Sequence, residues 1–226
     1  LRTTAEVDHL STFKKMVACG EAGDRSINML TAGNLATSQV VVNLLLGGIA
    51  QGSAPNLLIL PSLFECAMLV GEQASSVAKT SQHRAHMQEG FGSNFLLGGQ
   101  IKGQPQELYQ IYQEGNCISA TEDTPFFQIG ESKYGKPILD RSISHESSLE
   151  DAVRALLVSF DSTIRSNLSV GFPIDLMVYH RNSCTLPAGI RVDDSDPYLH
   201  NIRAQWSEGL KAILQQFDVP PDYTFK

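Results

Sequence analysis

The sequence predicts an α+β protein in which antiparallel sheets are covered by helices on the outside. Strands and helices are grouped along the chain rather than alternating one by one, which disfavours a parallel sheet built from βαβ units. Turn signals such as Gly115-Asn116 lie between neighbouring β runs and predict hairpins. The chain has 226 residues, 42% of them hydrophobic, and no Pro-, Gly- or Ser-rich linker divides it. We therefore expect one domain over 1–226.

The first third of the chain is expected to pass from a strand pair into two helices. The turn GEAGDR leads into a short strand at 26–30. From Asn34 onward the apolar residues are too dense for a half-buried strand, and they predict a helix over about 34–47. The segment SAPNL ends this helix, and Pro61 suits the first turn of a second helix over about 61–82.

Short β runs and apolar stripes predict the remaining elements. Strands are expected at 94–101, 107–113, 116–120 and 173–180. Helices are expected at 131–143, 148–167 and 197–217. The helix over 148–167 has the clearest signal, because Ser148 can cap it and the apolar residues after it recur at helical spacing.

Composition excludes several classes of protein. The net charge of −7 disfavours nucleic acid as a partner, since phosphate binding requires a basic surface. No apolar run reaches the ~18–20 residues needed to cross a bilayer, so no membrane partner is expected. The four cysteines are too widely separated for metal-ligand spacing and are expected to be reduced thiols. With no signal peptide visible, we expect a cytoplasmic protein without metal or cofactor.

The motifs that could carry chemistry are weak when taken singly. Ser11 to Lys14 reads STFK, an S-x-x-K tetrad, but it leads into a strand and a turn rather than opening a helix. His83 and His86 could share a helix face, yet no nearby Cys, Asp or Glu completes a metal site. Neither a G-x-S-x-G elbow nor a phosphate loop occurs.

Three further segments stand at the ends of predicted elements. TFKKM leads a strand, TAG leads a helix and SNLSVG follows the long helix. Taken alone, the three segments are interpreted in turn as a solvated lysine pair, a turn and the end of a helix. Glycine before a helix also permits close approach to unpaired backbone N–H groups, which is the arrangement needed to hold an anion.

Taken in order, TFKKM, TAGNLATSQ, QIGESKYGKPILDR and SFDSTIRSNLSVGFPIDLMVY resemble the bacterial proteasome-related peptidases called ancestral β-subunits, or Anbu. The resemblance covers nearly the whole chain. It implies the fold of N-terminal-nucleophile hydrolases, a four-layer αββα sandwich of two antiparallel sheets between helix pairs. It also implies proteolysis by an N-terminal Thr, Ser or Cys, whose own α-amine takes up the proton.

The same resemblance implies roles for five residues. Lys15 is similar to the lysine that lowers the pKa of the α-amine, because a fixed cation disfavours the ammonium form. Gly33 matches the glycine whose N–H stabilises the oxyanion, and Ser169 resembles the serine that hydrogen-bonds near the amine. Thr31 and Gly130 are expected to border the substrate pocket.

The sequence departs from the family pattern at two places. Family members carry a first strand and hairpin, with the nucleophile and an acidic partner of the lysine, ahead of the segment that starts at Leu1. We expect that piece, on the order of 15–20 residues, to lie upstream of this chain. Proteasome β-subunits usually have Asp three residues before the serine of the last loop, where this sequence has Ser166 followed by Asn167.

The leading hypothesis is a subunit of a self-compartmentalising peptidase. It would assemble into a ring or a helical array and take peptides or unfolded proteins as substrates; the sequence leaves open whether an unfoldase takes part. One alternative is an assembly-forming protein with the same fold and little hydrolytic activity. The other is an N-terminal-nucleophile amidase acting on small amides, which needs no chamber.

Overall fold

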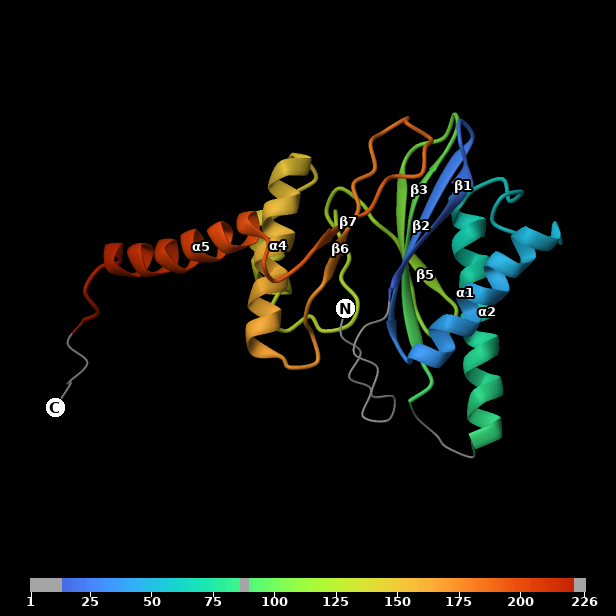
Figure 1. The fold of residues 1–226 in the computed structure, drawn as a ribbon, viewed down its shortest axis with the longest axis horizontal. Coiled ribbons are helices and arrows are strands. Elements are labelled where there is room, and N and C mark those ends of the chain that lie inside the picture. The colour runs from blue at the N-terminus through green and yellow to red at the C-terminus, as the bar shows by residue number, and fades with distance from the viewer. Residues whose placement is uncertain (1–13, 86–89, 222–226) are drawn as a thin grey trace.

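The computed structural model describes residues 14–85 and 90–221, and within these ranges the chain forms two antiparallel sheets and five helices (Figure 1). The larger sheet has its strands in chain order: β1 (Met16–Glu21), β2 (Arg25–Gly33), β3 (Ser93–Ile101), β4 (Glu107–Ile111) and β5 (Cys117–Ser119). The smaller sheet pairs β6 (Ile174–Leu176) with β7 (Ile190–Val192). The helices are α1 (Leu35–Gln51), α2 (Leu63–Ala85), α3 (Lys136–Ser142), α4 (Leu149–Ser166) and α5 (Pro197–Gln216).

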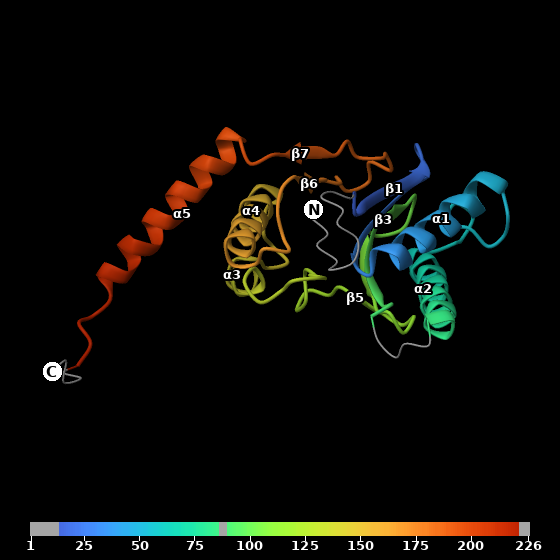
Figure 2. The same ribbon diagram turned by 60° about the horizontal axis from the view of Figure 1, so that its bottom comes forward.

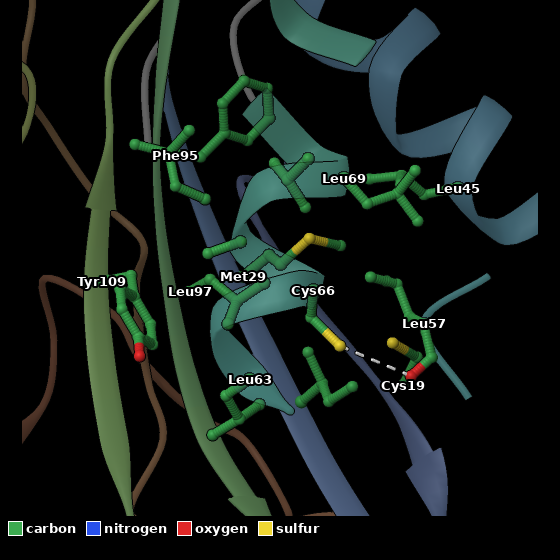
Figure 3. Close-up of a cluster of buried hydrophobic side chains, with 14 of the residues drawn as sticks. Cys19, Met29, Leu45, Leu57, Leu63, Cys66, Leu69, Phe95, Leu97 and Tyr109 are labelled. Carbon is green, nitrogen blue, oxygen red and sulfur yellow. Dashed lines mark hydrogen bonds between the residues drawn. The ribbon is translucent and has the colours of Figure 1, made fainter. Parts of the chain in front are cut away.

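The main core lies between the larger sheet and the two helices α1 and α2, which cover one of its faces (Figures 1 and 2). Alternate residues of β2 and β3 point into this core, as the two-residue period of a strand requires. Figure 3 shows Met29, Phe95 and Leu97 against Leu63, Cys66 and Leu69 of α2. Burying a large apolar side chain of this kind contributes about 1.5–3 kcal/mol, so this cluster holds α1 and α2 on the sheet.

A second, smaller core joins α4 to the two-stranded sheet and to the start of α5. Leu157, Ile174, Val192 and Leu199 are buried together there. Arg191 of β7 faces Asp175 of β6 across the pair and donates two hydrogen bonds to its carboxylate, at 2.8 and 3.0 Å. Side chains on β6, β7, α4 and the first turn of α5 therefore form one packed unit.

The segment between β6 and β7 is tied to the larger sheet by polar contacts. The buried Gln100 side chain of β3 accepts hydrogen bonds from the hydroxyl of Tyr179 and the backbone N–H of Asn182. At the β1–β2 turn, the N–H of Gly23 donates to the carbonyl of Cys184 at 2.9 Å. These contacts fix the smaller sheet relative to the larger one.

Helix α5 extends away from the rest of the molecule beyond its first turns (Figures 1 and 2). Arg203 holds the start of the helix in place. It forms ion pairs with Asp161 of α4 and with Asp194, and its guanidinium lies over the ring of Phe172, 5.0 Å from the ring centroid. Farther along, the helix leaves large apolar side chains exposed: Trp206, Leu210, Ile213, Leu214 and the following Phe217.

The structure confirms a mixed fold with antiparallel sheets, shortens two of the predicted elements and adds one strand that was not predicted. The strand predicted at 173–180 is limited to β6, because the chain beyond Leu176 leaves the sheet and bonds to Gln100 instead. The helix predicted at 131–143 is only α3, since the residues before it form a hydrogen-bonded turn. Strand β7 was not predicted, because its three residues, IRV, are too short to give a pattern.

Candidate active site

The start of β1 and the end of β2 lie side by side, which brings Lys15 next to Thr31. The carbonyl of Lys15 accepts the N–H of Thr31 at 3.0 Å and so continues the pairing of Met16 with Leu30. Lys15 is partly buried, and loss of solvent lowers the pKa of its ammonium group. Within residues 14–85 and 90–221, no hydrogen bond or ion pair engages its Nζ atom.

A cavity of about 260 Å³ opens between this point and helix α1. Its walls include Lys14, Lys15 and Val17 at the start of β1, Thr31 of β2, and Ser38, Gln39, Val42 and Asn43 of α1. Asn34 places α1 here, because its side chain caps the helix by accepting the N–H of Thr37 at 3.0 Å. The predicted pocket residue Thr31 therefore lines a cavity beside Lys15.

Gly33 stands where β2 ends and α1 is about to begin, and its backbone has φ of +109°. A Cβ atom at this position would lie 2.5 Å from the carbonyl oxygen of Gly92 and 3.0 Å from Cα of Ser93. The same carbonyl accepts the N–H of Asn34 at 3.0 Å, so it cannot move away freely. Only glycine satisfies both the positive φ and the close approach of the neighbouring strand.

Gly130 lies in the loop that follows β5 and packs against the end of β2. Its φ is +83°, and a Cβ atom there would lie 3.4 Å from Cβ of Ala32. The loop is shaped by Glu131, which accepts the side-chain amide of Gln128 on its carbonyl and the N–H of Lys133 on its carboxylate, both at 2.9 Å. Gly130 thus borders the Thr31–Gly33 segment.

Ser169 is exposed in the loop after α4 and bonds to Asn167, the residue that caps the end of that helix. Its N–H and its hydroxyl both donate to Oδ1 of Asn167, at 2.8 and 2.6 Å. Asn167 in turn donates its Nδ2 to the carboxylate of Glu131 at 2.6 Å. The N–H of Lys133 first, and the Asn167 amide next, hold the pKa of Glu131 below its usual range.

Contacts of the five predicted residues, or of their neighbours in the sequence, connect the segments that carry them. Lys15 bonds to Thr31, the Thr31–Gly33 segment packs against Gly130, and the Glu131–Asn167 hydrogen bond joins the Gly130 loop to Ser169.

Sequence reasoning missed Glu131 altogether and noted Asn167 only as a neighbour of Ser166. Each lies inside a string that the sequence had singled out, GESKYG and SNLSVG, but their hydrogen bond joins segments that are distant in the sequence.

The other motifs of the sequence find no support in the described part of the chain. Ser11 of the STFK tetrad and His86 lie outside it, as does the side chain of His83. Among residues 14–85 and 90–221, no group of three or more His, Cys, Asp or Glu side chains could hold a metal ion. No helix formed by these residues has the length and apolar character needed to span a membrane.

Fold and site together define an α+β protein of two antiparallel sheets, with a lysine and a glycine-led helix at one end of the larger sheet and a serine in the loop after α4. No family model and no curated protein matches the sequence. Solved structures do. The chain is similar to Anbu from Pseudomonas aeruginosa, described as a helical assembly, with 49% identity, a TM-score of 0.93, and coverage of 100% of this chain and 92% of that one.

Two further Anbu structures are also similar to this chain. Anbu (ancestral beta-subunit) from Yersinia bercovieri has 44% identity, a TM-score of 0.91, and coverage of 97% of this chain and 91% of that one. The Anbu (Gly-1) mutant from Hyphomicrobium sp. strain MC1 has 41% identity, a TM-score of 0.89, and coverage of 97% and 92%. The chain belongs to the Anbu family.

Proposed function

We propose that this protein is a proteasome-like peptidase subunit that hydrolyses peptide bonds with an N-terminal Thr, Ser or Cys. The nucleophile is assigned to a segment ahead of Leu1. The observation that carries the proposal is the half-buried Lys15, whose ammonium group has no partner among the described residues and which lines a cavity together with Thr31, two residues before Gly33. A desolvated cation next to a helix start is suited to activating an amine and stabilising an oxyanion.

Each predicted residue has a defined task in this mechanism. The hydroxyl or thiol of the nucleophile attacks the peptide carbonyl, and its α-amine accepts the proton. Such an amine has a reference pKa of about 7.7–8.0, and the charge of Lys15 lowers that pKa, so that the free base is available near neutral pH. The N–H of Gly33 donates to the oxyanion, a contact worth about 2.7–4 kcal/mol in comparable sites. Ser169 bonds to the amine, and Thr31 and Gly130 border the bound peptide.

The same proposal treats the whole of 1–226 as one domain of the four-layer αββα type. The α1–α2 layer, the larger sheet, the smaller sheet and the α3–α4 layer would be its four layers. No metal or cofactor takes part.

Self-association into a ring or helical array would enclose the site and restrict it to peptides or unfolded chains. The similar Pseudomonas aeruginosa protein is described as a helical assembly. The exposed apolar side chains of α5 and of α1, where Val40 and Leu44 are uncovered, supply surface for such contacts. Light scattering across a range of concentrations is expected to give a multi-subunit particle, and a monomer throughout would contradict this part of the proposal.

Replacing Lys15 tests the catalytic part. In the full-length protein with its preceding segment, Lys15→Ala is expected to lower kcat for fluorogenic peptides by about 100-fold or more with little change in KM. Lys15→Arg is not expected to restore activity, because a planar guanidinium does not replace a compact ammonium.

Lys102→Ala is the matched control, since this exposed lysine lies in the β3–β4 turn. Sequencing of the mature N-terminus identifies the nucleophile. Equal activity of the Lys15→Ala and Lys102→Ala proteins would rule out the role given to Lys15.

An assembly-forming protein with little hydrolytic activity is the second candidate. The observation that favours it is Ser166, which stands at the end of α4 where proteasome β-subunits usually carry Asp. An intact assembly that turns over no peptide substrate would support this reading.

A further inference from the structure

The side chain of Asn167 is the point at which two loops of the site meet. Three hydrogen bonds use its amide: two from Ser169 to Oδ1, and one from Nδ2 to Glu131. Its own N–H donates to Thr163 at 2.8 Å and thereby closes the last turn of α4. The amide is thus held at a fixed place relative to both loops.

The partners determine which way every proton in this network points. The backbone N–H of Ser169 can only donate a hydrogen bond, so the Asn167 side-chain atom that it contacts is the amide oxygen, Oδ1. The group bonded to Nδ2 is a carboxylate oxygen of Glu131, which accepts. Oδ1 can therefore only accept from the Ser169 hydroxyl, 2.6 Å away, and the single proton of that hydroxyl is directed toward Asn167.

A hydroxyl whose proton is already donated offers only lone pairs to any other partner. The Ser169 side chain is exposed, so these lone pairs are open to a group entering the site. They suit a hydrogen-bond donor such as an amine or ammonium N–H. They do not suit an acceptor such as a carbonyl oxygen.

We propose that Asn167 and Glu131 are positioning residues that keep the Ser169 hydroxyl as an acceptor for the α-amine of the N-terminal nucleophile. This inference rests on the proposed function above. An amine that donates one N–H to Ser169 has a fixed rotation, and its lone pair then points in a defined direction. The interaction also favours the protonated amine and opposes the effect of Lys15, so the two groups together hold its protonation equilibrium near neutral pH.

Variants of the network separate this role from simple support of the fold. In Asn167→Ala the Ser169 hydroxyl is free to turn and donate to the amine lone pair, so the pKa of the amine is expected to fall. The pH dependence of α-amine acylation by acetic anhydride, followed by mass spectrometry of the N-terminal peptide, measures this pKa without requiring catalysis. For peptide hydrolysis we expect a fall in kcat of about 10-fold or more, with KM within about twofold.

Two further proteins sharpen the test. Glu131→Gln keeps the shape of the side chain but leaves one carbonyl oxygen to accept from the two donors that the carboxylate accepts from in the wild type. A smaller fall in the amine pKa is therefore expected. In a Ser169→Ala background, Asn167→Ala is expected to cause no additional shift. The control is Asn201→Asp, which changes an amide to a carboxylate on an exposed turn of α5.

The outcomes distinguish this inference from the proposed function. An amine pKa that is the same in the wild type, Asn167→Ala and Glu131→Gln proteins overturns the inference, as does a shift that persists without the Ser169 hydroxyl. If the wild type hydrolyses peptides but the amine pKa does not change in Asn167→Ala, the proposed function stands and the role of Asn167 is removed. A pKa that depends on Asn167 in a protein without peptidase activity upholds the inference and removes the proposed function.

Discussion

Replacing Gly33 by alanine should destabilise the protein through two separate physical effects. The first is conformational, because φ of +109° is unfavourable for a residue with a Cβ atom and costs about 1–2 kcal/mol. The second is steric, because the new Cβ atom would lie 2.5 Å from the Gly92 carbonyl oxygen, a backbone atom that is held by its bond to Asn34. Overpacking of this kind costs about 1–3 kcal/mol, so the total is about 2–5 kcal/mol.

Gly103→Ala isolates the first effect. This glycine, in the β3–β4 turn, also has a positive φ of +79°, but a Cβ atom there would meet nothing within 4 Å. Urea unfolding of both variants and the wild type is expected to show that Gly33→Ala costs about 1–3 kcal/mol more than Gly103→Ala. If the two variants unfold at the same urea concentration, the contact with Gly92 does not constrain the site and the steric argument fails.

Two more outcomes follow from the charges and thiols. Hydrogen bonds from Arg191 hold the pKa of Asp175 below its usual value, so this pair stabilises the fold above the unfolded-state pKa of about 3.9, and the stabilisation is lost as pH falls through the lower folded-state pKa. The gap in thermal midpoint between the wild type and Arg191→Ala should therefore be present at pH 7 and close in strong acid; a gap that is unchanged there would contradict this. Burial raises the pKa of Cys19 to about 11 and of Cys66 to about 12, whereas Cys117 is partly exposed. An aromatic disulfide reagent at pH 8 should modify Cys117 first and the other two only after unfolding, and equally fast labelling of Cys66 would refute that order.

The longer helices were predictable from the sequence. α4 falls within a few residues of its predicted range, because its cap, Ser148, and its apolar periodicity are local signals. α1 also falls within a few residues of its predicted range, which came from the density of apolar residues after Asn34. The extent of β6 was not predictable. The alternating residues after Leu176 read as a strand, but their partner is Gln100, far away in the sequence.

The site shows the same division. The resemblance to Anbu pointed to Lys15, Gly33 and Ser169, and the structure supplies the steric reason for glycine at position 33. The resemblance could not reveal that Asn167 forms a hydrogen bond with Glu131, because nothing local in either segment encodes that pairing. Hydrogen bonds between distant loops arise only once the chain has folded.

The contacts that assemble the site have a consequence for the order of events during folding. Lys15 lies at the start of β1, on the sheet that forms the main core, whereas Ser169 follows α4 of the second core, and the two buried clusters share no residue. The entropy of closing such long loops is overcome only when distant parts of the chain meet. We therefore expect the site to be one of the last features to form, so that a nascent or half-folded chain would carry its individual residues without their joint chemistry. For a proposed peptidase, this delay would protect neighbouring unfolded chains in the cell from premature cleavage.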